Sequence, residues 1–473
     1  MTTTEELEKP MKWGLSTLIK EPFTTPQSPI ALLKKLNAPQ WFTFLAAFIG
    51  WTLDAMAYFS VNLAVTEIAL DFEVPNSRVA EAITITLAVR SVGALLFGLA
   101  ADKWGRRWPL MVDIVMFAGL ELASGFAPDF NSFFIIRALF GIAMGGEWGL
   151  GNAIAMEAVP PECRGLFSGI LQQGYAMGNL LATALYFLIV PRLGWRALMW
   201  ICSFPAFLAI GIRFFVPESE TFEEIARRRQ AAQGANDFKA FARALWVGVK
   251  KHYLLAFYCV ILMACFNFFS HGSQDLYPTF LKTQLGYSVG DATTNNFIGS
   301  AGAIVGGTLL GYYGQYIGRR RCVILCCIGA GVCVYPWSMI ANIAGLRVSV
   351  FFIQFFIQGA WGNVPAYLSE LSPPTMRGLF PGLCYQLGNL ISSASAQVEA
   401  QVGEQYPTTN AAGASIPNYA LTQAILIGGV SAILLLVISF GPEQKDALVN
   451  IKDFQNAENF EIVHIEVGEK QKM

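Results

Sequence analysis

The chain contains two copies of one loop pattern, separated by a constant 213 residues. The first copy reads Gly-Leu-Ala-Ala-Asp-Lys-Trp-Gly-Arg-Arg over residues 98–107, and the second reads Gly-Tyr-Tyr-Gly-Gln-Tyr-Ile-Gly-Arg-Arg over residues 311–320. The same offset relates segment 157–165 to segment 370–378, each with Glu at its start, a Pro-Pro pair and a final Arg-Gly. Two matches in one register indicate a chain built from two equivalent units.

Each copy of the loop lies between long apolar runs, which places the duplicated unit in a membrane. The chain has 473 residues, 54% of them hydrophobic and only 14% charged, whereas soluble domains carry about 25% charged residues. A spanning helix needs about 20 mainly apolar residues, and backbone polar groups inside a bilayer must bond within their own helix. We count twelve candidate spans, at 41–64, 79–101, 108–126, 131–155, 166–190, 195–216, 253–280, 294–316, 321–342, 347–369, 377–401 and 418–441.

The spans and the repeat together predict an all-α membrane protein. Its twelve transmembrane helices form two pseudo-symmetric six-helix halves, an arrangement found in many secondary transporters. Lys and Arg gather in the tails and in alternate loops, so the positive-inside rule places both termini in the cytoplasm. The expected parts are an N-terminal tail, a first half, a cytoplasmic central loop, a second half and a C-terminal tail, at 1–40, 41–216, 217–251, 252–441 and 442–473.

The segments outside the spans carry fewer signals. Residues 222–248 alternate apolar and charged residues at helical spacing, which predicts an amphipathic helix on the membrane surface or a solvated basic linker. The tail ahead of Trp41 contains no apolar core, so we expect no cleavable signal peptide and a location in the plasma membrane. The tails are candidate binding sites for regulators of endocytosis.

Charge and cysteine usage exclude several classes of function. The net charge of −1 gives no reason to expect a nucleic-acid partner. The nine cysteines lie mostly inside predicted spans and show no zinc-type spacing, so we expect packing residues, no metal and no cofactor. No nucleophile–base set or phosphate loop occurs in the soluble segments, which argues against an enzyme. We expect a monomer in contact with membrane lipid.

The repeated loop has the composition of a conformational gate. Gly98 allows two helices to approach closely, and Asp102 ends a span where it can face the positive end of a neighbouring helix dipole. Arg106 and Arg107 are expected to anchor the loop to lipid headgroups, although the loop could be a topology determinant only. In the second copy Gln315 replaces the aspartate, which predicts a weaker latch. The gate residues are Gly98, Asp102, Lys103, Gly105, Arg106, Arg107 and, as a candidate partner of Asp102, Arg164.

This loop resembles the signature between spans 2 and 3 of the major facilitator superfamily. The resemblance covers essentially the whole chain, because the second half carries its own copy. It implies twelve helices with the substrate held between the two halves.

Span 7 carries an unusually dense run of polar residues from Asn267 to Thr279. Ionisable groups at membrane depth are costly, so they usually face a cavity or a partner. His271 and Asp275 are four residues apart and therefore share a helix face. A histidine titrates near neutral pH, which makes this pair a candidate for proton coupling. Gly272 and Pro278 are expected to loosen the helix where the substrate binds.

The run matches the pattern N-x-x-[S/T]-H-x-[S/T]-Q-D-x-x-x-T at every fixed position. In this it is similar to the Jen-type fungal carboxylate–proton symporters, a branch of the sialate–proton symporter group. The resemblance implies transport of small carboxylates with protons. The residues of this run that we expect to bind substrate are Asn267, Ser270, Ser273, Gln274 and Thr279.

Other polar groups at membrane depth complete the candidate site. Arg90 lies in the middle of span 2, where a fixed bidentate cation suits a carboxylate; alternatively it forms a structural ion pair with Asp54, Glu81 or Glu147. Gln173 and Gln386 are equivalent positions of the repeat. They, with Asn389, either bind substrate or join helices, and the resemblance favours substrate for the glutamine and asparagine of span 11. Asp54 and Glu147 are further proton-carrying candidates, and Glu147 is expected to pair with Arg137.

The favoured function is therefore a proton-coupled symporter of small carboxylates, most simply monocarboxylates such as lactate and pyruvate. A dicarboxylate symporter for malate or succinate remains open, as do a sugar porter and a non-transporting nutrient sensor of the same fold. The single convincing intramembrane arginine favours monocarboxylates. The charged His271–Asp275 run argues against a sugar site.

Overall fold

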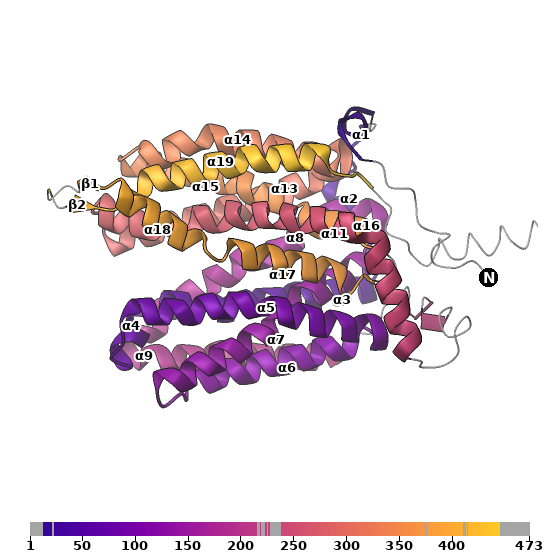
Figure 1. The fold of residues 1–473 in the computed structure, drawn as a ribbon, viewed down its shortest axis with the longest axis horizontal. Helices are drawn as coiled ribbons and strands as arrows, with labels where there is room; N and C mark the ends of the chain where they lie inside the picture. The colour runs from indigo at the N-terminus through magenta and orange to yellow at the C-terminus, as the bar shows by residue number, and fades with distance from the viewer. Residues whose placement is uncertain are drawn as a thin grey trace, which may run out of the picture.

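The computed structural model describes residues 13–20, 23–214, 218, 223–224, 226–227, 238–373, 376–409, 413 and 415–444. They form two bundles of helices that lie against each other, one from each half of the chain (Figure 1). The first bundle contains α3 (Ala38–Leu63), the short α4 (Val65–Asp71), α5 (Asn76–Trp104), α6 (Arg107–Ser124), α7 (Phe130–Ala158), η1 (Pro161–Cys163), α8 (Arg164–Gln172) and α9 (Gly174–Phe214). Because α9 contains non-helical Gly194, it supplies the end of one span and the whole of the next.

The second bundle has more interruptions. It contains α11 (Phe238–Gln274), α12 (Tyr277–Thr279), the π-helical turn η2 (Phe280–Gln284), α13 (Val289–Ile317), α14 (Arg319–Met339), α15 (Ile343–Trp361), α16 (Val364–Leu371), α17 (Phe380–Ser392), α18 (Ser395–Gln405) and α19 (Tyr419–Phe440). Strands β1 (Thr408–Thr409) and β2 (Ser415–Ile416) pair antiparallel between α18 and α19. Two short helices, α1 (Leu15–Lys20) and α2 (Pro29–Leu33), precede the first bundle.

The duplication seen in the sequence is repeated in the helix boundaries. Helices α5 and α13 begin and end at residues 213 positions apart. Both stop at a motif glycine, Gly105 with φ of 100° and Gly318 with φ of 97°. Residues other than glycine rarely adopt this left-handed backbone conformation, so glycine is required where the chain turns sharply into the next helix. The invariant spacing of the loop therefore reflects a turn that each half needs.

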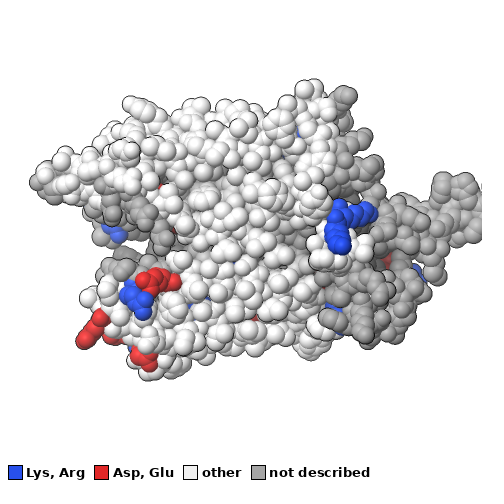
Figure 2. Space-filling view, viewed as in Figure 1, with Lys and Arg blue, Asp and Glu red and all other residues white. Residues whose placement is uncertain are grey.

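Length and composition identify the membrane-spanning part. Eight stretches of the described chain are long and apolar enough to cross a bilayer, and one of them, Pro161–Gly211, is long enough for two spans. Shorter or interrupted helices, such as α6 and the α17–α18 pair, complete the twelve-helix bundle. Figure 2 shows a broad zone of uncharged surface between charged side chains at the two ends of the molecule. The end with loops 103–107 and 318–321 is called the basic end below.

Glycines bring helices of the two halves into contact near the basic end. A Cβ added to Gly149 of α7 would lie 2.7 Å from the Cα of Gly382 in α17. A Cβ added to Gly311 of α13 would lie 2.6 Å from the Cα of Gly169 in α8. Contacts this short leave no room for a side chain, so the halves meet backbone to backbone. The basic end is therefore closed in this conformation.

The segment expected as a surface helix, 222–248, lies partly outside the described residues. Its longest described stretch begins at Phe238 and belongs to α11, which departs from helical geometry at His252 and then enters the membrane-spanning region. In Figure 1 this first part of α11 crosses the basic end of the bundle. The junction with span 7 is thus a bend in one continuous element.

Candidate functional site

The polar run of span 7 lies where that helix is interrupted. Helix α11 ends at Gln274, and the chain resumes helical geometry at Tyr277, next to Pro278. The Asp275 amide still donates to the His271 carbonyl at 2.9 Å, but Asp275 and Leu276 belong to no helix. The interruption frees the Asp275 carboxylate from the regular helix surface. It agrees with the loosening that Gly272 and Pro278 predict.

His271 joins the broken helix to α17. Its Nδ1 lies 3.2 Å from Asp275 Oδ2, and its Nε2 lies 3.2 Å from Asn389 Oδ1. Asn389 Nδ2 in turn donates to Gln386 Oε1 at 3.3 Å. His271, Asn389 and Gln386 are buried, whereas Asp275 is 36% exposed in its side chain. Four polar residues predicted from the sequence thus form one connected chain that reaches an accessible carboxylate.

The other face of the same run contacts α15. Gln358 Nε2 donates to Ser270 Oγ at 3.2 Å, and Gln354 Nε2 donates to Ser273 Oγ at 3.1 Å. Gln274 Nε2 donates to Gln354 Oε1 at 3.0 Å. These bonds hold the hydroxyl and amide groups of span 7 in fixed positions, because both partners belong to packed helices.

The substrate-binding roles of Asn267 and Thr279 stay predictions. Asn267 is buried, donates to the Met263 carbonyl of its own helix at 2.9 Å and is not among the described lining residues of the cavity. The side chain of Thr279 lies outside the described part of the chain.

A cavity of about 170 Å³ opens between the halves on the side away from the basic end. This volume is below the roughly 300–1,000 Å³ of sites for drug-sized ligands, so it suits a small molecule. Asp275 is the charged residue among its described lining residues. The wall consists of Phe59, Asn62, Leu63, Tyr175, Ala176, Asn179, Ser273, Gln274, Asp275, Tyr277, Pro278, Asn296, Gly299, Ser300, Ala303, Val350, Gln354 and Gln358.

Arg90 is a buried cation of α5 that is not among the described lining residues of this cavity. Its guanidinium carbon lies 4.8 Å from the Tyr58 ring centroid, and one nitrogen lies 3.0 Å from Met144 Sδ. Within the described chain no carboxylate comes within the 4.0 Å that defines an ion pair with Arg90. It is near enough to His271 to act on it electrostatically. The structural ion pair considered from the sequence is thus not formed in this conformation.

Buried acids lie beside Arg90 in the first half. Asp54 of α3 is fully buried, and its carboxylate oxygens have no hydrogen-bond partner among the described residues. One turn earlier, Gly50 provides the space that the Glu147 carboxylate of α7 occupies. Asp113 of α6, which packs against Gly146, interacts with Glu147. Three acids and one base therefore share a small volume, which is where a proton could be held.

The expected pairing of Glu147 with Arg137 is wrong. Arg137 Nη1 donates to Glu121 Oε2 at 2.6 Å, and Glu121 also accepts from Ser60 Oγ at 2.9 Å. Arg137 and Glu121 lie nearer the opposite end of the bundle, on α7 and α6. Arg137 and Glu147 are ten residues apart along α7, which is nearly three turns and beyond the reach of one side-chain pair.

Gln173 lies apart from the His271 chain. It occupies the interruption between α8 and α9, and its amide packs against Gly307 of α13. Neither amide atom has a hydrogen-bond partner in the described structure, and Gln173 does not line the cavity. Its repeat equivalent, Gln386, does reach the polar chain. The two glutamines therefore occupy different environments.

The first gate motif latches the halves together at the basic end. Asp102 accepts from the backbone amides of Gly378 and Leu379 at 2.7 and 3.0 Å, just ahead of α17. A carboxylate at a helix N-terminus is stabilised by free amide groups and by the helix dipole. Gly98 packs against Leu379, where a side chain would collide with its Cα.

The arginines of the motif face inward as well as outward. Arg106 pairs with Glu157 at 3.1 Å, and both side chains are only 2% exposed, so the expectation that Arg106 anchors to headgroups is wrong. The Arg107 side chain donates to the Phe214 carbonyl, and its backbone amide donates to Glu218. Lys103 lies over the Trp104 ring. Arg164 is buried and donates to the Met156 carbonyl at 3.3 Å.

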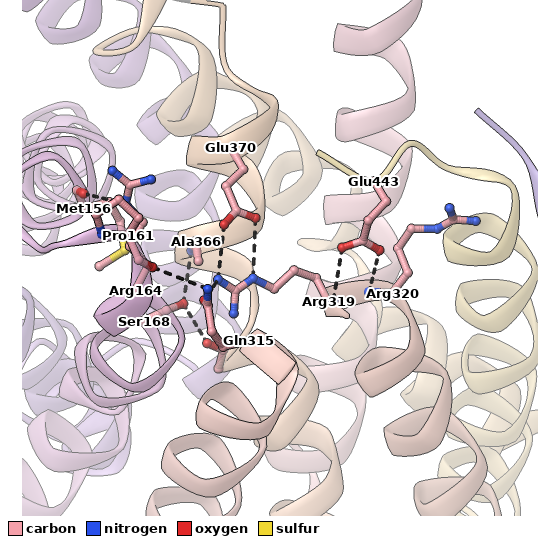
Figure 3. A network of polar contacts seen from close by, with 11 residues as sticks. Met156, Pro161, Arg164, Ser168, Gln315, Arg319, Arg320, Ala366, Glu370 and Glu443 are labelled. Atoms are coloured by element: carbon pink, nitrogen blue, oxygen red, sulfur yellow. Dashed lines mark hydrogen bonds and ion pairs between the residues drawn. The ribbon is translucent and has the colours of Figure 1, made fainter. Parts of the chain in front are cut away.

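The second copy forms an equivalent but different latch, which Figure 3 shows from close by. Arg319 pairs with Glu370 at 3.1 Å, as their repeat equivalents Arg106 and Glu157 do. Gln315 donates to the Pro161 carbonyl at 3.4 Å, whereas its repeat equivalent in the first half, Asp102, accepts two shorter bonds. Ser168 of α8 adds contacts across the halves, to the Gly362 carbonyl and the Ala366 amide. The neutral, longer contact of Gln315 agrees with the weaker latch predicted from the sequence.

Gln354 and Gln358 are among the polar lining residues of the cavity that the sequence did not reveal, together with Asn62, Tyr175, Asn179, Asn296 and Ser300. Gln354 and Gln358 lie four residues apart in an otherwise apolar stretch of α15, and both line the cavity. That spacing places them on one helix face and is a usable signal. Tyr175 and Asn179 on α9 have the same spacing and face them from the first half.

Comparison with known proteins identifies the family. The sequence profile described as Major Facilitator Superfamily matches residues 41–396. The chain is 33% identical over 433 residues to the carboxylic acid transporter protein homolog of Saccharomyces cerevisiae, covering 88% of this chain and 70% of that protein. It is 24% identical over 414 residues to the sialic acid transporter NanX of Escherichia coli, covering 87% and 96%.

A solved structure supports the same fold. The proton:xylose symporter XylE, bound to 6-bromo-6-deoxy-D-glucose, superposes with a TM-score of 0.71 at 19% identity, covering 86% of this chain and 96% of that one. The repeated gate loop, the twelve-helix architecture and these matches lead to one conclusion. The chain belongs to the major facilitator superfamily of membrane transporters, in the branch that contains the yeast carboxylic acid transporter homologue.

Proposed function

We propose that this protein is a proton-coupled symporter of small monocarboxylates such as lactate and pyruvate. The observation that carries the proposal is the Asp275 carboxylate on the wall of the cavity, in contact with His271 at 3.2 Å. The proposal also draws on the yeast relative, which is described as a carboxylic acid transporter homologue.

Coupling follows from the charge of the cavity wall. A substrate carboxylate about 5 Å from an ionised Asp275 would be repelled by about 3 kcal/mol at an effective dielectric constant of 20. Uptake of one proton by the His271–Asp275 pair removes this repulsion. Proton and anion therefore favour each other's binding, and by linkage the effect is reciprocal. The loaded pair carries no additional net charge through the membrane.

Arg90 attracts the substrate carboxylate. Its guanidinium lacks an ion pair in the described structure, so its charge is free to stabilise an incoming anion. A planar guanidinium also matches the two oxygens of a carboxylate. Asn389 and Gln386, connected to His271, provide amide groups for the remaining oxygens. The described lining residues of the cavity include no cation, and Arg90 lies outside that lining, so a second carboxylate would have no cation of its own, which favours monocarboxylates over dicarboxylates.

The closed basic end fits one state of an alternating-access cycle. With the basic end in the cytoplasm of a cell whose plasma membrane holds the protein, the cavity faces the outside. Binding of substrate and proton would close the outer side, and the latches formed by Asp102 and Gln315 would then release.

The test is uptake in cells that lack their own carboxylate transporters. Expressing cells should accumulate labelled lactate, and addition of lactate should raise the pH of a weakly buffered medium. A protonophore should abolish accumulation against the gradient. Uptake that ignores both pH and the protonophore would exclude proton coupling, and absence of lactate, pyruvate and succinate uptake at normal surface expression would exclude carboxylate transport.

A further inference from the structure

We infer that Gln354 of α15 orients the neighbouring Gln274 amide so that its oxygen is left as a hydrogen-bond acceptor at the cavity. The site therefore prefers a carboxylate with a neighbouring hydroxyl group over its keto counterpart. The inference rests on the proposed function, because it names the class of small carboxylate that the same cavity takes. Gln354 is a positioning residue here, and it acts through Gln274.

The orientation of the Gln354 amide is determined by a backbone group. Gln354 Nε2 lies 3.4 Å from the Ser273 carbonyl oxygen and 3.1 Å from Ser273 Oγ. A carbonyl oxygen only accepts, so the side-chain atom that faces it must be the NH₂ group. Ser273 Oγ can accept from the same group, because its own proton goes to the Ser270 carbonyl at 2.9 Å. Gln354 is 4% exposed, which leaves little freedom to rotate.

This orientation determines that of Gln274. Gln354 Oε1 must accept, and the group it faces at 3.0 Å is therefore Gln274 Nε2. Rotating the Gln274 amide by half a turn would bring two carbonyl oxygens together. The Gln274 Oε1 atom is thus left as an acceptor, without a hydrogen-bond partner in the described part of the protein, on a residue that lines the cavity.

The position of Gln274 selects the complementary substrate group. Gln274 and Asp275 both line this small cavity, so a substrate held there can meet the Gln274 oxygen. A hydroxyl on the adjacent carbon donates to this acceptor, whereas a keto oxygen only accepts and would face it unfavourably. A bound substrate that covers this half-buried acceptor without donating to it binds more weakly, so the keto acid is expected to bind less well than the hydroxy acid.

The experiment compares lactate, pyruvate and propionate in the full-length protein. These acids differ at one carbon, which carries a hydroxyl, a keto oxygen or no oxygen. Initial rates are measured over a concentration range, and the ratio of Vmax to half-saturation concentration is compared between substrates. We expect lactate to exceed pyruvate and propionate by about three- to tenfold, the effect of one hydrogen bond.

The variant Gln354→Met keeps the size of the side chain but frees the Gln274 amide. We expect its lactate-to-pyruvate ratio to fall to about one, with propionate uptake retained. Gln423→Met is the matched control, because Gln423 is an equally buried glutamine on α19 that does not line the cavity. It should keep the wild-type ratio.

Each outcome decides the matter. Equal or greater efficiency for pyruvate in the wild type would overturn the inference while leaving the proposed function intact. An unchanged ratio in transport-active Gln354→Met would remove Gln354 from the selection, and if that variant does not reach the membrane, the wild-type ratios alone decide. A wild type that transports none of the three acids would overturn the proposed function and this inference with it.

Discussion

At the residue scale, the central feature is an anionic wall next to a buried cation. Asp275 is accessible from the cavity, His271 lies between it and Asn389, and Arg90 lies nearby without an ion pair in the described chain. Placing a fixed charge in a membrane protein interior is costly, so such groups are retained where they interact with a transported charge. Arg90 leads to a prediction on substrate binding, and Asp275 leads to a prediction on proton coupling.

Arg90→Lys should be almost as damaging as Arg90→Gln. Lysine keeps the positive charge but cannot offer two parallel N–H groups to a carboxylate. We expect the half-saturation concentration for lactate to rise by about 10- to 100-fold in both variants, the effect of losing a charge-assisted hydrogen bond. Uptake is normalised to protein at the cell surface, and wild-type affinity in Arg90→Lys would rule out bidentate binding at this position.

Asp275→Asn should separate coupling from binding. Asparagine has nearly the same shape but cannot take up and release a proton near neutral pH, so accumulation against a gradient should be lost. Exchange of labelled for unlabelled lactate across the membrane should persist, with a weaker dependence on pH. If the variant still concentrates lactate under a proton gradient, the proton is carried elsewhere, and the buried Asp54 and Glu147 become the candidates.

At the element scale, helix contacts depend on glycine faces. Gly306 of α13 packs against the backbone of Phe355 in α15, where an added Cβ would lie 2.6 Å from the Phe355 Cα. Gly331 of α14 has open space at the same position, with no atom within 4 Å of an added Cβ. The two glycines therefore have different roles although both lie inside helices.

Gly306→Ala should destabilise the protein by about 1–3 kcal/mol, because the helices must move apart. Gly331→Ala should be neutral or stabilising by up to about 1 kcal/mol, since alanine favours the helix. The measurement is the temperature midpoint at which each detergent-solubilised variant aggregates. Equal midpoints for the two variants would show that the α13–α15 contact adapts to a methyl group.

At the whole-molecule scale, the latches at the basic end control the conformational equilibrium. Asp102 holds the start of α17 by bonds of 2.7 and 3.0 Å, whereas Gln315 donates to the Pro161 carbonyl at 3.4 Å. Cys163 reports on this end, because it is fully buried where η1 meets α2. Its thiol is therefore shielded from reagents while the basic end is closed.

Asp102→Asn should weaken the latch by about 1–2 kcal/mol, the difference between charged and neutral hydrogen bonds. Opening of the basic end would expose the Cys163 thiol. We therefore expect faster labelling of Cys163 by a maleimide. The labelled residue is identified by mass spectrometry.

Asp291→Asn is the matched control for this measurement. It removes the same charge at the opposite end, where Asp291 pairs with half-exposed Arg347 at 3.0 Å. Labelling of Cys163 should remain at the wild-type rate. Identical rates in all three proteins would mean that Asp102 does not limit opening at the basic end.

The sequence by itself determined the class of protein, the number of spans and the polar run of span 7 that lines part of the cavity. These properties follow from local causes: a bilayer demands long apolar helices, a sharp turn demands Gly105 and Gly318, and a charge at membrane depth demands a partner. Tertiary structure decided which partner each group meets. Arg137 pairs with Glu121 instead of Glu147, and Arg106 turns inward to Glu157.

The role of α15 was also decided by the tertiary structure. Gln354 meets Gln274 across 80 residues of sequence, and only the packing of α15 against α11 brings the two amides together. A periodic pattern shows which residues share a helix face, but the neighbour of that face depends on how the whole bundle packs. For this reason Ser273, Gln274 and Asp275 could be named from the sequence, while their partners on α15 and the directions of their hydrogen bonds came from the folded structure.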